Sequence, residues 1–255
     1  MDLGLAGLRA LVTGGSDGLG AAIARELTAD GARVTIAARA SERLDATAAA
    51  TGAAPIVADL STPEGPEEAV ARAARTVDGL DLLVVNSGGP PPGRFEDLSE
   101  AQWQQAIDGT LWSSIRLVRA ALPRLRDSAS PAILVILSSS VREPIQGLMT
   151  SNVLRPGLAG MIKALVPEIA PVRINGVAPG RVSTARIARL DAKRAEDSGV
   201  TVAEIERQTI ARIPLGRYGD PAEVGRLGAF LLSPAASYVN GAIVPVDGGM
   251  VKALP

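Results

Sequence analysis

The sequence predicts a doubly wound α/β fold, in which one parallel sheet carries helices on both faces within a single Rossmann-type domain. Short apolar runs alternate along the chain with longer helical segments, the order that a parallel sheet with crossover helices requires. A glycine-rich turn at 13–20 joins the first apolar run to the first helical segment. Polar residues or glycines follow the later apolar runs, as they do at the carboxyl edge of such a sheet.

The expected elements follow from the apolar runs and from helix start signals. Apolar runs without strict alternation, typical of strands buried on both faces, lie at 8–12, 33–38, 56–58, 80–85, 131–138, 172–178 and 242–246. They give about seven strands. Helices are expected at 19–29, 41–50, 63–76, 99–122, 149–170 and from Pro221 onward. The segment 181–212 is polar and weakly periodic, and we expect 181–213 to form a mobile lid over the substrate.

The composition limits the function. The 255 residues are 47% apolar, carry a net charge of −1, and include neither cysteine nor histidine. The low charge argues against nucleic acid or an anionic membrane as the main partner. The missing thiols and imidazoles argue against a metal site and remove the commonest general base. We therefore expect one cytoplasmic domain over 1–255 that binds a small molecule, without metal, nucleic acid or membrane.

The glycine-rich turn predicts a phosphate-binding loop. A strand that breaks into glycines before a helix directs the free N–H groups and the positive dipole end of that helix at a bound anion. The spacing G-x-x-x-G-x-G differs from the common dinucleotide fingerprint, so a simple tight connection between strand and helix remains the alternative. The turn residues expected to contact a cofactor are Gly14, Ser16, Asp17, Gly18 and Leu19.

Further landmarks lie along the chain at Asp59-Leu60, Asn86-Ser87-Gly88, Trp103, Pro179-Gly180, Thr184 and Asp247-Gly248-Gly249. Together with the turn at 13–20, they resemble the short-chain dehydrogenase/reductase family over nearly the whole length. The pattern looks most like the branch of the 3-oxoacyl-carrier-protein reductases. The resemblance implies the strand order 3-2-1-4-5-6-7, an oxidoreductase activity, and assembly as a homotetramer or homodimer. It also implies cofactor contacts from Asp59, Leu60, Asn86, Gly88, Arg155, Pro179, Gly180 and Thr184.

The residues at the end of the second strand favour NADP(H) over NAD(H). A carboxylate there hydrogen-bonds the ribose 2′-hydroxyl of NAD(H) and repels a 2′-phosphate. Ala38 and Arg39 stand at this point, so the repelling charge is missing and a guanidinium partner for the phosphate is present. The alternative is that Arg39 is a solvated loop residue.

The catalytic positions depart from the family pattern, which is an Asn, a Ser and a Tyr-x-x-x-Lys pair. The helix that follows the motif aligns so that Arg155 stands at the lysine and Ser151 at the tyrosine. The family spacing then places Ser138 at the serine and Thr110 at the asparagine. A serine hydroxyl is too weak an acid to replace the phenol, and arginine can hold ribose hydroxyls but does not titrate. The resemblance thus implies a retained cofactor site with atypical catalytic residues.

Other side chains are weighed as proton donors or substrate contacts. Glu143 and Tyr218 are candidates for the proton donor. The alternative for Glu143 is a solvated pair with the neighbouring Arg142, and the alternative for Tyr218 is packing at the hinge of the lid. Arg94 and Arg181 flank the expected pocket and would attract an acidic substrate, unless both are solvated.

Three functions remain open from the sequence. The first is an NADP(H)-dependent reductase of a ketone or 3-oxoacyl carbonyl, with water delivering the proton. The second is a catalytically degenerate NADP(H)-binding protein that acts as a sensor or partner subunit. The third is a non-redox dehydration or isomerisation on the same scaffold.

Overall fold

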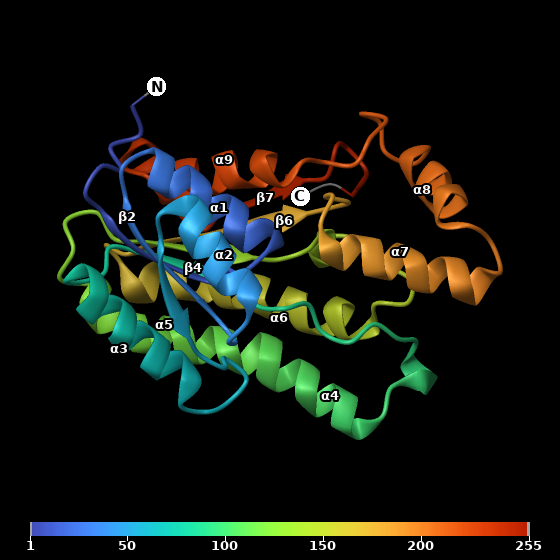
Figure 1. The fold of residues 1–255 in the computed structure, drawn as a ribbon, viewed down its shortest axis with the longest axis horizontal. Coiled ribbons are helices and arrows are strands. Elements are labelled where there is room, and N and C mark those ends of the chain that lie inside the picture. The colour runs from blue at the N-terminus through green and yellow to red at the C-terminus, as the bar shows by residue number, and fades with distance from the viewer. Residues whose placement is uncertain (1, 254–255) are drawn as a thin grey trace.

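The computed structural model describes residues 2–253 and contains a seven-stranded sheet in the order β3-β2-β1-β4-β5-β6-β7 (Figure 1). Every neighbouring pair of strands is parallel. The predicted fold class and strand order are therefore confirmed. The strands are β1 Arg9–Thr13, β2 Arg33–Ala38, β3 Ala54–Val57, β4 Leu82–Val85, β5 Ala132–Ile136, β6 Arg173–Pro179 and β7 Ile243–Val246.

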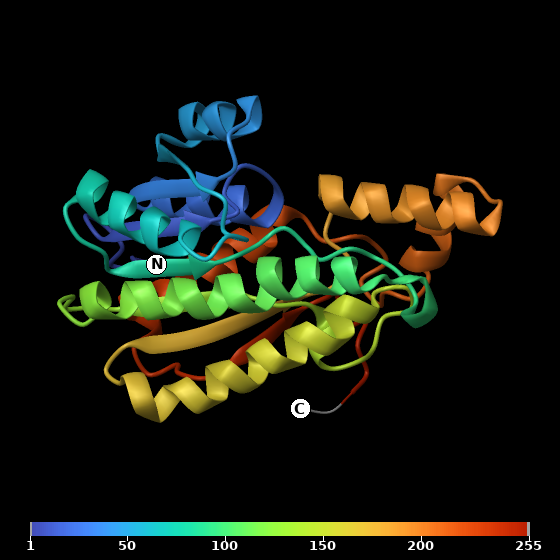
Figure 2. The same cartoon turned by 90° about the horizontal axis from the view of Figure 1, so that it is seen from below.

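Helices cover both faces of the sheet. They are α1 Gly18–Ala29, α2 Glu42–Thr51, α3 Gly65–Val77, α4 Glu100–Ala106, α5 Ser113–Leu125, α6 Met149–Ile169, α7 Ala185–Ser198, α8 Val202–Ile210 and α9 Pro221–Leu232. α1, α2 and α9 lie on one face, and α3, α5 and α6 lie on the other (Figures 1 and 2). Within residues 2–253, no helix is both long and apolar enough to cross a membrane.

The strands lack polar alternation because both of their faces are buried. In β4, Leu82 and Val84 join the apolar core under α1 and α9, whereas Leu83 and Val85 join the core under α3 and α5. Successive side chains point to opposite faces of a sheet, so a strand covered by helices on both sides needs apolar residues at every position. This is why the apolar runs alone located the strands.

Two expectations about helices need correction. The helix expected at 99–122 is a chain of α4, a π-helical segment at Ile107–Trp112, and α5, which continues to Leu125. The segment 181–212, to which no helix was assigned, forms α7 and α8 at one end of the molecule (Figure 2). Thr184 and Thr201 cap these two helices, and Gly199, at φ +65°, ends α7.

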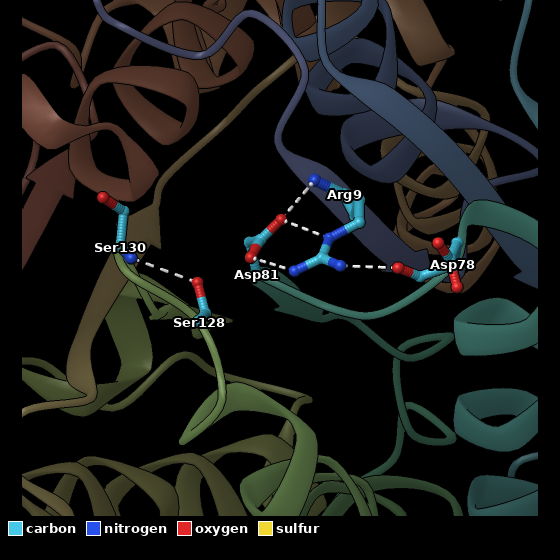
Figure 3. A network of polar contacts seen from close by, with 5 residues as sticks. All are labelled: Arg9, Asp78, Asp81, Ser128 and Ser130. Carbon is cyan, nitrogen blue, oxygen red and sulfur yellow. Dashed lines mark hydrogen bonds and ion pairs between the residues drawn. The ribbon is translucent and has the colours of Figure 1, made fainter.

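An ion pair joins β1 to the start of β4 at the amino edge of the sheet (Figure 3). The Nε and Nη2 of Arg9 each donate to the carboxylate of Asp81 at 2.7 Å, and the backbone N–H of Arg9 donates to it at 2.8 Å. The Asp81 side chain is only 4% exposed. Burial by itself would raise the pKa of Asp81, but the hydrogen bonds and charge of Arg9, together with Ser128, hold the pKa below its usual value.

Candidate functional site

The glycine turn between β1 and α1 is packed so closely that Gly14, Gly15 and Gly20 have no room for side chains. Gly14 adopts φ +58°, and a Cβ at Gly20 would collide with the carbonyl oxygen of Gly14. The amide of Asn86, just after β4, donates to the same carbonyl at 3.2 Å. The structure therefore holds the turn against the next strand of the sheet, which leaves the start of α1 open to a ligand.

Asp17 acts as the N-cap of α1. Its carboxylate accepts from the backbone N–H of Gly18 at 2.7 Å and forms an ion pair with Arg43 at 3.5 Å. The charge of Arg43 offsets that of Asp17, which would otherwise repel a phosphate bound at the start of α1. Contacts from Asp17, Ser16 and Leu19 to a cofactor stay predictions.

The N-termini of α1 and α7 meet at the carboxyl edge of the sheet. A Cβ at Gly18 would lie 3.4 Å from the methyl group of Thr184, whose hydroxyl accepts from the N–H of Ile187 and caps α7. A cleft opens beside this contact and is lined by both helices. Two positive helix ends at one point suit a pyrophosphate, so the residues present fit a dinucleotide.

Arg39 and Asp59 lie near each other beyond the ends of β2 and β3. Both are exposed, and Leu60 is half-buried. The hydroxyl and N–H of Ser61 donate to Asp59 and lower its pKa, and the charge of Arg39 adds to this effect. No carboxylate stands directly after β2, since that position carries Ala38 and Arg39. This environment fits an adenosine with a 2′-phosphate.

The remaining predicted cofactor residues lie at the same edge. Gly88 is exposed, and a Cβ there would meet open space. Pro179 ends β6, and Gly180 packs against Asp247 so closely that its Cβ would lie 2.7 Å from the Cβ of Asp247. The loop after β6 is therefore fastened to the loop after β7.

The structure pairs Ser151 with Ser140. The two Oγ atoms lie 3.1 Å apart, and Ser151 is only 5% exposed. The hydroxyl of Ser138, which family spacing selects, instead accepts from the N–H of Ser140 at 3.1 Å. The family spacing does not select Ser140, although Ser140 lies in the same serine run, 138–140.

Arg155 lies one helical turn after Ser151 and is only 6% exposed. Its guanidinium donates to the carbonyl of Ile136 at the end of β5. Burial, with a smaller effect from the charge of Arg186, lowers the pKa of Arg155 to about 10. Arg155 therefore remains a cation at neutral pH in a place with little water.

Thr110 lies within the π-helical segment and is 1% exposed. Its hydroxyl finds no hydrogen-bond partner among residues 2–253. Buried hydroxyls are normally paired, and π-helical segments are frequent at functional sites. The hydroxyl of Thr110 is therefore a candidate contact for a ligand atom, and without a ligand its burial lowers stability.

Replacing Thr110 with valine is expected to raise the free energy of unfolding by about 1 kcal/mol, because valine keeps the shape and removes an unpaired buried hydroxyl. Urea denaturation would measure the change. Thr209→Val is the matched control, since the buried hydroxyl of Thr209 donates to the carbonyl of Ile205 at 2.7 Å and its loss should destabilise. Equal destabilisation by both substitutions would contradict the prediction.

The alternative proton donors have other partners or surroundings. The Tyr218 hydroxyl donates to Asp191 at 2.9 Å, and burial, together with that carboxylate, raises the pKa of the phenol. Arg181 also pairs with Asp191 at 2.9 Å, so these contacts anchor α7. Glu143 and Arg94 are exposed. The phenol of Tyr218 is therefore a weaker acid than usual, and its hydroxyl is already hydrogen-bonded to Asp191.

Comparisons with known proteins agree with this architecture. A family model described as enoyl-(acyl carrier protein) reductase matches residues 14–251. A 3-oxoacyl-[acyl-carrier-protein] reductase from Aquifex aeolicus is 31% identical over 258 residues, which cover 98% of this chain and 100% of the relative. The L-sorbose reductase from Gluconobacter frateurii, solved with NADPH and L-sorbose, has a TM-score of 0.92 at 28% identity and full coverage of both chains.

A further solved structure belongs to a protein with an atypical catalytic center. It is an NADPH-bound short chain oxidoreductase from Pseudomonas aeruginosa. It has a TM-score of 0.85 at 31% identity and covers 96% of this chain and 97% of its own. From the family match over most of its length and these relatives, the chain belongs to the short-chain dehydrogenase/reductase family of oxidoreductases.

Proposed function

We propose that this protein is an NADP(H)-dependent oxidoreductase that reduces a ketone or 3-oxoacyl carbonyl with an atypical catalytic centre. The observation that supports this proposal most is that helix N-termini, buried hydroxyls and a buried guanidinium lie along one edge of the sheet. The start of α1 meets the start of α7 there, and the buried hydroxyls of Ser140 and Ser151 and the guanidinium of Arg155 follow beyond β5. One end of this edge suits a phosphate-bearing cofactor, and the other suits a polar group that carries developing negative charge.

The cofactor would be held by residues at the carboxyl ends of the strands. The glycine turn and Thr184 would hold the pyrophosphate, Asn86 and Arg155 the riboses, and Asp59 the adenine. Arg39 would pair with the 2′-phosphate. The NADPH in the structures of the sorbose reductase and of the Pseudomonas oxidoreductase supports the same choice here.

Carbonyl reduction requires a hydride at carbon and a proton at oxygen, and bound NADPH supplies the hydride. The protein must orient the carbonyl and stabilise the charge that develops on its oxygen. Arg155 contributes a fixed positive charge in a buried place, where electrostatic effects are strong. Ser151, its partner Ser140, and Ser138 contribute hydroxyl donors, Thr110 contributes a further hydroxyl, and water supplies the proton. The segment 181–213 limits further access of solvent.

Titration of the purified protein with NADPH and NADH tests the cofactor part of the proposal. NADPH is expected to bind at least about tenfold more tightly, and Arg39→Asp should weaken NADPH binding by about 30-fold because it places a carboxylate beside the 2′-phosphate. Arg33→Asp is the matched control, since Arg33 is also exposed but begins β2 at the opposite edge of the sheet. Equal affinities for the two nucleotides would contradict the choice of NADP(H).

A second candidate function is cofactor binding without catalysis, as a sensor or partner subunit. The observation in its favour is that Ser151, at the position of the family acid, is buried against Ser140. A panel of ketones and 3-oxo compounds with NADPH, followed at the nicotinamide absorbance, separates the two functions. Tight binding without NADPH oxidation by any carbonyl supports the second, and no binding of either nucleotide excludes both.

Assembly as a homodimer or homotetramer is part of this proposal. Trp112, at the end of the π-helical segment before α5, and Val153, on α6, are exposed apolar residues. The guanidinium of Arg116 lies 5.2 Å from the centre of the Trp112 ring. Exposed apolar side chains on these helices support an interface between copies of this chain.

A further inference from the structure

The site contains two guanidinium groups that lack acidic partners. Arg155 is buried and donates to one backbone carbonyl, that of Ile136. Arg186, in the first turn of α7, donates to the carbonyls of Gly89 at 3.0 Å and Pro90 at 2.9 Å. Within residues 2–253, no ion pair includes either arginine. Each guanidinium has five N–H donors, so several donors on both remain for a ligand.

The loop after β4 connects Arg186 to the start of α6. Arg186 packs on Gly89 so tightly that a Cβ at this glycine would collide with the guanidinium. The hydroxyl of Thr150 donates to the carbonyl of Pro91 at 2.7 Å, and Thr150 precedes Ser151 in α6. The loop is thereby fastened to α7 by Arg186 and to the start of α6 by Thr150. The charge of Arg186 is near enough to lower the pKa of Arg155.

A partly buried guanidinium without a carboxylate partner among residues 2–253 is costly, because burial disfavours its charge, and the charge of Arg155 adds repulsion. A bound anion would remove both costs, and a guanidinium fork matches a carboxylate or a phosphate oxygen pair. We propose that Arg186 forms an anion site that binds a carboxylate on the carbonyl substrate, beside the hydroxyls of Ser140 and Ser151. This inference rests on the proposed reductase function and names the class of its substrate as short oxo acids.

The location favours a substrate carboxylate over a cofactor phosphate. The contact between Gly18 and Thr184 supplies the helix ends suited to the pyrophosphate. Arg186 is directed instead to the loop after β4, which leads to the start of α6 and the paired hydroxyls of Ser140 and Ser151. The phosphates of the cofactor remain the competing source of an anion, and the test separates the two.

The test uses 2-oxo and 3-oxo acids of four to six carbons, each with its uncharged methyl ester. With NADPH, the wild-type protein should reduce the best acid at least about tenfold more efficiently, by kcat/KM, than its ester. Arg186→Gln should lower kcat/KM for the acid about 30-fold, mainly through KM, and change that for the ester by less than about twofold. Arg186→Lys should recover part of the loss, since it restores the charge without the fork.

Arg194→Gln is the matched control, because Arg194 is exposed on the same helix and its loss removes the same charge. This variant should resemble the wild type. A matching loss of NADPH affinity in Arg186→Gln, with acid and ester affected alike, would assign the anion site to the cofactor and overturn the proposal. Equal use of acids and esters by the wild type would also overturn it.

A binding measurement keeps this test separate from the proposed function. In the presence of NADP⁺, the acids should raise the unfolding temperature of the wild type and of Arg194→Gln, but not that of Arg186→Gln. A shift that depends on Arg186 without any reduction would contradict the reductase function and retain the anion site. Absence of both the shift and the reduction would overturn the anion site.

Discussion

Replacing Arg155 with methionine is expected to reduce the NADPH-dependent reductase activity by at least about 100-fold, while the folded state stays as stable or gains up to about 2 kcal/mol. The reason is that Arg155 is buried and has no acidic partner within residues 2–253. Its burial costs free energy in the folded protein, so an apolar side chain of similar length removes that cost. A residue that lowers stability in this way is expected at a functional site.

Urea denaturation and steady-state kinetics on the same preparation would measure both effects. Arg173→Met is the matched control, because the Arg173 guanidinium donates to the carbonyls of Leu231 at 2.8 Å, Leu232 at 3.0 Å and Ser233 at 2.9 Å. Those carbonyls end α9, so Arg173 serves the fold, and its loss should destabilise by about 2 kcal/mol. If Arg155→Met destabilises as much as Arg173→Met, Arg155 is structural and the proposed role is wrong.

The sheet and its carboxyl edge could be predicted because their signals are local. Strands buried on both faces require continuous apolar runs, and the glycines of the turn are required by contacts between neighbouring elements. The close packing of Gly20 on Gly14 is one such contact. The loop residues Asn86 and Thr184 then lie at the expected edge because parallel strands end together.

Helices α7 and α8 escaped prediction because their packing depends on distant partners. α7 buries Asp191 and Ala195, so the buried face is not an apolar stripe. The carboxylate of Asp191 is paired with Arg181 and with Tyr218, which lies 27 residues away in the sequence. A polar residue that is buried through such contacts looks like a surface residue in the local pattern.

The contact between Ser140 and Ser151 escaped prediction for a related reason. The spacing rule selects Ser138, but the short 3₁₀ helix at Ser139–Val141 turns the hydroxyl of Ser140 toward α6. Arg186 had no signal at all, because its contact with Gly89 and Pro90 joins segments 97 and 96 residues apart. Which polar groups meet depends here on turns and long-range contacts that residue types alone do not specify.

Replacing Arg9 with methionine is expected to lower the free energy of unfolding by about 3 kcal/mol at pH 7, because it leaves the carboxylate of Asp81 buried without its counter-charge (Figure 3). Urea denaturation would measure the loss. The control is Arg72→Met, which removes an exposed guanidinium bonded to the carbonyl of Val57 and should cost less than about 0.5 kcal/mol. Similar losses in both variants would contradict the special role of the Asp81 contact.

The stabilisation that Arg9 provides should also decrease as the pH falls. The pKa of Asp81 in the folded protein lies below the unfolded value of about 3.9, because the hydrogen bonds and charge of Arg9, together with Ser128, outweigh burial. The ionised carboxylate therefore contributes stability that is full above the unfolded pKa and is lost as the pH falls through the folded pKa. Without Arg9, burial raises the pKa of Asp81, so the difference between the wild type and Arg9→Met should be largest near pH 7 and should shrink as the pH falls through the carboxylate range. A difference that stays constant down to pH 2 would mean that lost packing of the Arg9 side chain, rather than the ion pair, accounts for the destabilisation.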